Sequence, residues 1–294
     1  MTRAFRFPTG LKLMNLLLGG WTILVFAFLY IPIILLIVYS FNASRMNIEW
    51  EGWTLEWYRQ MAGDTTLIDA MKKSLWIAAI TTVVSVIIGT TGAWLLHRFR
   101  YPMRRLINML IFIPMAIPEV IMGISLLILF QVVLRWLTGM QEMPSAPEWF
   151  TALDFDRGIT TVVISHVTFC FPFVLVAVQA RLAGVDPALE EAAMDLGATP
   201  LRAFWSVMVP YLMPAIISGS LMAFTLSMDE IIITFFTAGP DSQTLPLKIF
   251  GRVKKGLDPS LNAISAVFIL ATALLVVIAE WVKRPGRDAR PAKS

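Results

Sequence analysis

Residues 185–210 read VDPALEEAAMDLGATPLRAFWSVMVP, an acid-rich stretch in the middle of an apolar chain. Asp186 is a favourable N-cap residue, and Pro187 suits the first helical position because its missing N–H is not needed there. Gly197 fits the left-handed residue that follows a helix end. Thr199 then repeats the cap ahead of a second proline. The stretch therefore predicts two short helices joined by a tight turn.

The first of these helices has an apolar side. Leu189, Ala192, Ala193 and Leu196 recur at helical spacing and share one face. Glu190 falls in the first turn, where the positive end of the helix dipole favours a carboxylate. The sequence thus predicts a small, stiff and partly apolar unit that could dock into another protein.

The composition is that of an integral membrane protein. Of 294 residues, 57% are hydrophobic and only 15% are charged, against about 25% charged residues in ordinary globular chains. The mean hydropathy is +0.72. The net charge is +4, from 24 basic and 20 acidic residues. The basic residues flank apolar runs, so membrane topology explains them better than nucleic-acid binding does.

Six apolar runs are long enough to cross about 30 Å of hydrocarbon as helices. We therefore expect an all-α integral membrane protein with one six-helix domain over residues 16–282. The predicted spans are residues 16–41, 74–96, 107–134, 159–182, 207–228 and 261–282.

The charges between the spans predict the topology, since short cytoplasmic loops carry an excess of Lys and Arg. Residues 97–106 are basic and contain no acid, so they should face the cytoplasm. Residues 42–70 and 135–158 carry several acids and should face outside. The tails, 1–15 and 283–294, are basic. With an even number of spans, both termini are expected in the cytoplasm.

Segment 237–260 is basic, against the orientation rule, but that rule is a bias and the other loops agree with one another. Its cations are Lys248, Arg252, Lys254 and Lys255. The first outer loop contains Trp50, Trp53 and Trp57, which we interpret as membrane-interface anchors rather than a ligand cage.

Three carboxylates lie inside or beside predicted spans. Glu119 follows Pro118 within the third span, and Asp229 and Glu230 are adjacent at the end of the fifth. A charge at the bilayer centre costs at least ~2.5–3.5 kcal/mol, so it usually faces a cavity or a partner. Two adjacent carboxylates also repel each other unless a cation or water intervenes. We interpret the three as an anionic path for a cationic substrate. The alternative is that Asp229 and Glu230 only cap a helix end.

The residues give little support to enzyme chemistry. The chain has no G-x-x-x-x-G-K-[ST] loop to hold nucleotide phosphates and no H-E-x-x-H zinc motif. His97 and His166 are its only histidines, and Cys170 is its only cysteine. We expect no catalytic site, metal or cofactor. We expect His166 to be a hydrogen-bonded packing residue and Cys170 a small buried one.

The opening stretch resembles the EAA loop of ABC importer permeases. The family pattern is E-A-A-x3-G-x9-I-x-L-P, and it is matched by residues 191–193, by Gly197 and by residues 207–210, with Val207 and Val209 in place of Ile and Leu. The resemblance implies a coupling loop, residues 185–206, that sits in a groove of a cytoplasmic ATPase. The alternative is an ordinary amphipathic connector. The contact residues implied are Glu190, Glu191, Ala192, Ala193, Asp195 and Gly197.

Two further stretches resemble polyamine permeases. Residues 117–127, IPEVIMGISLL, are similar to a P-[DE]-V-I-x-G-[IL]-S-L-L segment. Residues 226–230, LSMDE, followed by 239–240, GP, and 244–246, TLP, are similar to an L-S-[LM]-D-[DE]…S-G-P…T-L-P segment. The similarity extends from about Tyr30 to the last span and is closest to the putrescine type. Glu230 stands where many relatives have Asp, so the preferred diamine length stays open.

The resemblance implies a type I (MetI-like) permease of the bacterial inner membrane, forming half of the translocation path of a putrescine or spermidine importer. It also implies a second permease in a heterodimer, two cytoplasmic ATPase subunits that bind ATP and Mg, and a periplasmic polyamine-binding protein. Three alternatives stay open. One is another cargo, such as ferric iron, thiamine or an anion, the last disfavoured by the carboxylates. The others are an ion-coupled secondary transporter and a membrane enzyme.

Overall fold

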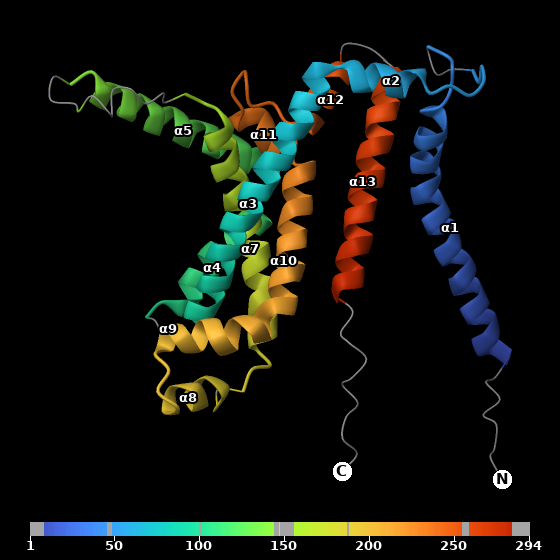
Figure 1. Ribbon diagram of the computed structural model, residues 1–294. Coiled ribbons are helices and arrows are strands. Elements are labelled where there is room, and N and C mark those ends of the chain that lie inside the picture. The colour runs from blue at the N-terminus through green and yellow to red at the C-terminus, as the bar shows by residue number, and fades with distance from the viewer. Residues whose placement is uncertain are drawn as a thin grey trace, which may run out of the picture. The chain divides into compact units, whose positions relative to one another are not determined.

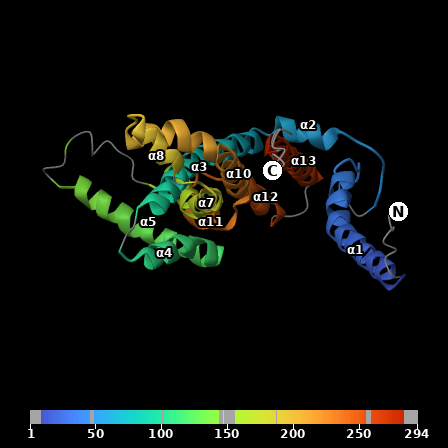
Figure 2. The same ribbon diagram turned by 90° about the horizontal axis from the view of Figure 1, so that it is seen from below.

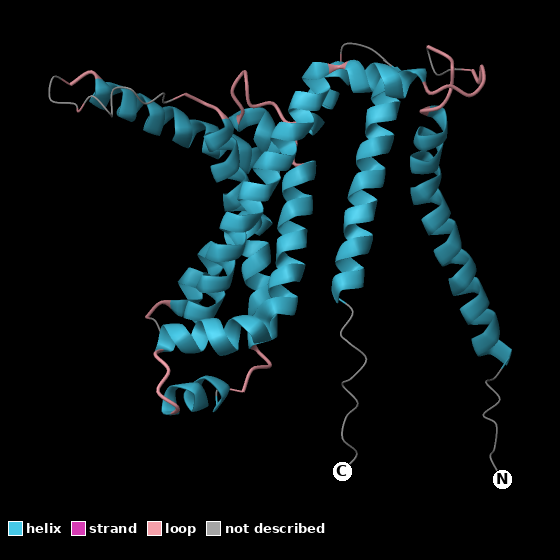
Figure 3. Ribbon diagram, in the orientation of Figure 1, coloured by secondary structure: helices cyan, strands magenta, loops and turns pink. Residues whose placement is uncertain are grey.

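The computed structural model describes residues 9–45, 49–99, 102–143, 147, 156–186, 188–254 and 259–283. All regular elements in these ranges are helical, apart from an isolated bridge between Asn42 and Trp53 (Figures 1 and 3). The helices are α1 (Thr9–Tyr39), α2 (Glu56–Gly63), α3 (Thr65–Arg98), α4 (Arg104–Ala116), α5 (Glu119–Gln141), α7 (Ile159–Leu182), α8 (Ala188–Asp195), α9 (Pro200–Ala203), the π-helix η1 (Phe204–Met208), α10 (Val209–Asp229), α11 (Ile232–Thr237), α12 (Leu245–Val253) and α13 (Pro259–Lys283).

Some residues named above lie outside the described ranges. They include the outer parts of both tails, residues 1–8 and 284–294, together with much of the second outer loop. The individual residues are Arg100, Glu148, Asp154, Pro187 and Lys255.

Five described helices are long and apolar enough to cross a membrane: Met14–Tyr39, α3, α5, α7 and the continuous helix Pro200–Asp229. In the position of the sixth predicted span, α13 is apolar over Pro259–Leu274 and helical to Lys283. The expectation of an all-helical membrane protein is therefore confirmed. The first helix starts at Thr9, earlier than the expected Leu16, and α3 starts nine residues before the expected Ser74.

The third span differs from its prediction. A single helix over residues 107–134 is wrong, because the chain forms α4 up to Ala116 and α5 from Glu119. Between them Ile117 is extended, with ψ 134°. Proline disfavours the helical region for the residue before it, so Pro118 explains the break. Glu119 is thereby placed in the first turn of a new helix.

The chain forms two compact units, described separately. The larger comprises residues 65–251 and 272–294, and its centre is the packing of α3, α7 and α10 (Figures 1 and 2). Gly89 of α3 and Gly219 of α10 both face Val174 of α7. A Cβ atom at these glycines would lie 2.8 Å and 3.1 Å from the valine side chain. Small residues at such contacts let membrane helices approach closely.

The smaller unit comprises residues 1–64 and 252–271. None of the most apolar window of α1 is buried, as suits a surface in contact with lipid. After α1, the side-chain amide of Asn42 donates to the Glu49 carbonyl at 2.7 Å, and its backbone carbonyl accepts from Trp57 Nε1 at 2.7 Å. Trp57 is therefore buried, which corrects its expected role as an interface anchor, whereas Trp50 and Trp53 are exposed.

Short helices replace parts of the predicted outer loops. Both α2 and α12 lie in segments that the sequence was expected to leave as loop. Arg252, one of the cations that ran against the orientation rule, pairs with Asp64 at 2.5 Å within the smaller unit. This local neutralisation reduces the conflict between that segment and the orientation of the other loops.

Candidate functional site

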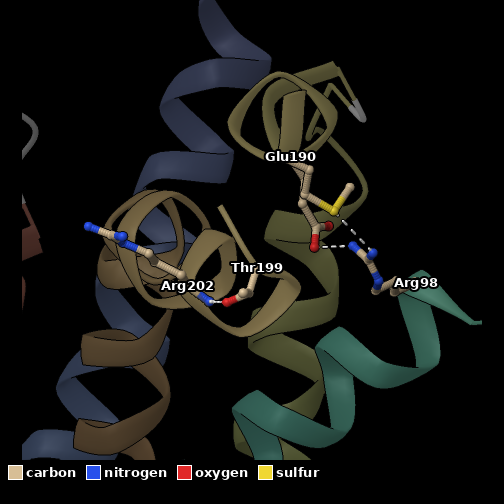
Figure 4. A network of polar contacts seen from close by, with 5 residues as sticks. Arg98, Glu190, Thr199 and Arg202 are labelled. Carbon is tan, nitrogen blue, oxygen red and sulfur yellow. Dashed lines mark hydrogen bonds and ion pairs between the residues drawn. The ribbon is translucent and has the colours of Figure 1, made fainter. Parts of the chain in front are cut away.

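The side chains that the sequence predicts as caps lie at the starts of α8 and α9. The Asp186 carboxylate accepts from the Ala188 N–H at 3.0 Å. The Thr199 hydroxyl accepts from the Arg202 N–H at 3.3 Å (Figure 4). Each cap satisfies a backbone donor that the first helical turn leaves without a partner. The cap at Thr199 is therefore confirmed, as is the Asp186 acceptor ahead of α8, whereas Pro187, predicted at the first helical position, lies outside the described residues.

The end of α8 is a Schellman turn. The Gly197 N–H donates to the Met194 carbonyl at 2.9 Å, and the Ala198 N–H donates to the Ala193 carbonyl at 3.1 Å. Gly197 has φ +88°, a conformation that L side chains rarely adopt. The glycine predicted at this position is thus required by the backbone, and it makes the joint between α8 and α9 tight.

The second helix of the stretch is longer than expected. The prediction of two short helices is wrong for this part, because α9 continues through η1 into α10 as one helix, Pro200–Asp229. Pro210 lies in the first turn of α10, directly after the π-helical residues. π-Helical turns and prolines both bend helices, and the ribbon turns between α9 and α10 (Figure 1). The loop is therefore joined to a transmembrane helix without a break.

An ion pair connects α8 to the end of α3. The Arg98 guanidinium pairs with the Glu190 carboxylate and also donates to Met194 Sδ at 3.7 Å (Figure 4). Its Cζ lies 5.7 Å from the ring centroid of Trp94 and 5.8 Å from that of Phe99. Cation–π contacts are significant within about 6 Å. Arg98 is therefore held on several sides at once.

A hollow of about 790 Å³ lies between the end of α3 and α8. Both cationic and carboxylate side chains line it, so its wall is polar rather than apolar. The lining residues are His97, Arg98, Phe99, Arg104, Val185, Glu190, Glu191, Met194 and Met208.

The predicted contact residues divide between two sides of α8. Glu190 and Ala193 are partly covered by the rest of the chain. Glu191, Ala192 and Asp195 are exposed, as are the apolar Leu189 and Leu196, at 44% and 90%. Exposed Gly197 closes the helix. The apolar face predicted from the spacing is thus largely uncovered in this chain, and carboxylates accompany it.

The second group of predicted site residues lies where helices break. Asp229 is the exposed last residue of α10. Glu230 follows in extended backbone, is 5% exposed, and accepts from the Ile233 N–H at 2.7 Å, so it caps α11. Glu119 starts α5, which packs on α11. The structure therefore brings together a helix-capping carboxylate and two more accessible ones.

Buried His166 of α7 spans this break. Its Nδ1 lies 2.8 Å from the Ser227 hydroxyl, and its Nε2 lies 2.8 Å from the Thr234 hydroxyl. Thr234 in turn donates to the Glu230 carbonyl at 3.0 Å. The expectation of a hydrogen-bonded packing residue is confirmed, and the contacts join both helices at the break.

The two groups lie at opposite ends of the same helix. Figure 1 shows α8 and α9 at one end of the larger unit and α11 at the other. The 21 residues of α10 span about 32 Å at 1.5 Å a residue, close to the thickness of the hydrocarbon core. A movement at α8 can therefore reach the carboxylates through one continuous element.

Sequence reasoning missed the role of Arg98, which it treated only as one cation of a basic loop. Arg98 and Glu190 are 92 residues apart, and no local pattern pairs them. The one available signal was their placement: a cation in the last turn of one helix and an acid in the first turn of another.

Comparison with known proteins places the chain among transport permeases. The family described as "Binding-protein-dependent transport system inner membrane component" matches residues 85–284. In Escherichia coli (strain K12), "Putrescine transport system permease protein PotI" is 40% identical over 272 residues, covering 92% of this chain and 90% of the relative. "Spermidine/putrescine transport system permease protein PotC" of the same organism is 36% identical over 270 residues, covering 92% and 95%.

A solved structure supports the fold. It is that of a bacterial ABC transporter involved in the import of the acidic polysaccharide alginate, with a TM-score of 0.68 and 14% sequence identity. The match covers 96% of this chain and 99% of that chain. At such low identity the likeness shows the fold alone. The predicted architecture, an all-helical ABC importer permease of the MetI-like type, is confirmed.

Proposed function

The chain belongs to the family of binding-protein-dependent transport system inner membrane components, and from this premise we propose that it imports polyamines. It is homologous to permeases, not to enzymes. In our proposal it forms half of the translocation path for putrescine or spermidine in an ATP-driven importer.

The observation that carries the cargo proposal is the acidic helix break. Asp229 is exposed at the end of α10, and Glu119 is partly exposed at the start of α5, beside α11. Carboxylates within or beside membrane spans usually face a pathway or a partner. They attract ammonium groups and repel anions. Weak contacts of this kind suit a path, since a tightly binding site would not release its substrate.

Glu230 has a different role in this proposal. Its carboxylate is buried and already accepts from the backbone of α11. It therefore holds the break in shape and adds negative charge nearby, while Asp229 and Glu119 make the brief contacts with the amine.

The coupling proposal rests on α8. Its exposed side combines Leu189, Ala192 and Leu196 with Glu191 and Asp195. We propose that this side sits in a groove of a cytoplasmic ATPase. Closure of two ATPase subunits on ATP and Mg then moves α8, and the movement switches the path from outward to inward opening. In this proposal ATP and Mg are bound by the ATPase subunits and not by this chain.

Other parts of the proposal are supported by the charges of the loops and tails and by the family resemblance. The α8 end of the larger unit faces the cytoplasm, as do both termini, and the carboxylate end faces the periplasm. The path is completed by a second permease in a heterodimer. A periplasmic polyamine-binding protein delivers the cargo to the outer face.

Radiolabelled putrescine uptake tests the cargo. The measurement uses cells that carry the whole operon, with unlabelled spermidine, thiamine and ferric iron as competitors. Asp229→Asn and Glu119→Gln should each reduce uptake while the assembly still purifies intact. Glu142→Gln, an exposed acid at the far end of α5, is the matched control. Competition by thiamine or iron but not by amines would transfer the proposal to another cargo. Uptake that persists without the ATPase genes would indicate a secondary transporter.

A further inference from the structure

The attachment of α8 to the rest of the chain is narrow. Helix α8 packs against α9 and η1, which follow it directly in sequence. Beyond these neighbours, the structure shows a polar link from its first turn to the last residue of α3. Glu190 and Arg98 make that link, and 92 residues of sequence separate them.

The link is well shielded for an ion pair near a surface. The side chains of Arg98 and Glu190 are only 23% and 13% exposed. Partly buried pairs are screened by salt much less than exposed ones. Met194 Sδ and the rings of Trp94 and Phe99 also contact the guanidinium. The arginine is therefore fixed in orientation before any partner protein binds.

The helix dipoles favour the same pairing. Arg98 is the last residue of α3, where the negative end of the dipole favours a cation, and Glu190 lies in the first turn of α8, where the positive end favours an anion. Each charge is stabilised by its own helix and by the other charge. The pair thus joins two helix ends that suit each other electrostatically.

We propose that Arg98 is a positioning residue that ties α8 to α3. A displacement of α8 then reaches the bundle by two routes, through α9 and η1 into α10, and through the ion pair into α3. Helices α3, α7 and α10 all pack on one another, so two routes apply the movement to this packed group at both α3 and α10, whereas one route would apply it at α10 only. This inference rests on the proposed function of α8 as the coupling helix.

The experiment compares transport with ATP hydrolysis in the full assembly reconstituted in proteoliposomes. Arg98→Ala and Glu190→Gln should lower putrescine uptake per ATP hydrolysed by roughly fivefold or more, the lower end of the usual range for coupling between sites. The basal hydrolysis rate of Arg98→Ala should change little. The double variant Arg98→Glu with Glu190→Arg should regain part of the loss, since the charges are exchanged.

The matched control is Arg105→Ala. Arg105 belongs to the same basic connection, in the first turn of α4, and has no ion pair within the described part of the chain. It should leave the uptake ratio unchanged. A loss with Arg105→Ala equal to that with Arg98→Ala would mean that net charge alone matters, and would overturn the proposal. Unchanged ratios in both Arg98→Ala and Glu190→Gln would overturn it as well.

A second measurement does not depend on the cargo or on the ATPase. Spin labels at Ile87→Cys on α3 and Leu196→Cys after α8 occupy exposed positions, whereas Cys170 is buried. The distance distribution should be narrow with Arg98 present and should lose its single narrow peak in Arg98→Ala. If Arg98→Ala leaves the distance distribution unchanged, Arg98 does not hold α8 against α3, whatever the cargo is. If the narrow peak is lost in Arg98→Ala but the unsubstituted assembly does not take up putrescine, the role of Arg98 stands and only the proposed cargo is rejected.

Discussion

The imidazole Nε2 of His166 lies 2.8 Å from the hydroxyl oxygen of Thr234, so that α7 is hydrogen-bonded to the helix that follows the acidic break. The other ring nitrogen contacts Ser227, which precedes the break. A single buried side chain therefore fixes two helix segments between which the backbone leaves the helical conformation at Glu230. The positions of the carboxylates depend on a residue that itself carries no carboxylate.

Replacing this imidazole should destabilise the protein. His166→Phe leaves the Ser227 hydroxyl without its partner on α7 and removes one of the two contacts of the Thr234 hydroxyl, which keeps the Glu230 carbonyl; a buried unsatisfied group costs about 1–3 kcal/mol. His166→Gln keeps a donor and an acceptor, so its loss should be smaller. Thermal unfolding in detergent measures both. A midpoint for His166→Phe equal to or above that for His166→Gln would contradict this explanation, since Phe keeps a ring but no hydrogen bond.

The glycines beside Val174 should tolerate no side chain. A Cβ at Gly89 would lie 2.8 Å from the Val174 Cβ and 3.0 Å from the backbone N of Leu175, and one at Gly219 would lie 3.1 Å from Val174. Overpacking of this kind costs about 1–3 kcal/mol. We expect Gly89→Ala to lower the thermal midpoint more than Gly219→Ala, because its nearest contacts are closer, at 2.8 Å against 3.1 Å for the side chain and 3.0 Å against 3.2 Å for the backbone.

The control for these substitutions is Gly139→Ala. Nothing lies within 4 Å of a Cβ at this position in α5, and alanine is the better helix former by about 1 kcal/mol. The thermal midpoint should stay the same or rise. A Cβ at Gly219 would lie nearest to Val174 Cγ1, which Val174→Ala removes. If Gly219→Ala costs less in the Val174→Ala background than in the unsubstituted chain, the contact is the cause; an equal cost contradicts this explanation.

Local signals in the sequence predicted the local structure well. The caps at Asp186 and Thr199 and the left-handed Gly197 depend on residues close in the chain, so their chemistry could be read directly. Apolar length located the spans for the same reason. Pro118 was visible too, but its effect on the span was underestimated, since apolar length outweighed the proline signal.

Tertiary contacts could not be predicted in this way. Arg98 meets Glu190, and Trp57 becomes buried, only because distant segments fold together. The carboxylates of Glu119, Asp229 and Glu230 were recognised as unusual, and helix capping was an alternative for the last two, but the sequence did not show which of them would cap; Glu230 does so in the structure. An amino-acid sequence by itself shows composition and periodicity, but it does not show which distant residues will contact one another.

The turn after α8 should be sensitive to a single methyl group. Gly197 has φ +88°, and a non-glycine residue in the left-handed region costs about 1–2 kcal/mol. Gly197→Ala should therefore loosen the joint and weaken co-purification of the ATPase. Gly184→Ala is the comparison, because that glycine precedes α8 without a left-handed φ and has room for a Cβ. Equal co-purification by both variants would argue against a role for the turn.

Reversing the charge on the exposed side of α8 should uncouple the motor. Glu191 is exposed and does not take part in the Arg98 ion pair, so Glu191→Lys leaves the attachment of α8 intact while placing a cation on the surface proposed to enter the ATPase groove. Truncating or reversing a charge at a buried interface costs about 2–5 kcal/mol, which is roughly 30-fold or more in affinity. Affinity purification of the assembly, followed by quantification of the ATPase subunit, measures the loss. Glu142→Lys reverses an exposed charge at the end of α5 and should retain the ATPase. Full retention by Glu191→Lys, with normal uptake, would mean that this face of α8 does not meet the motor.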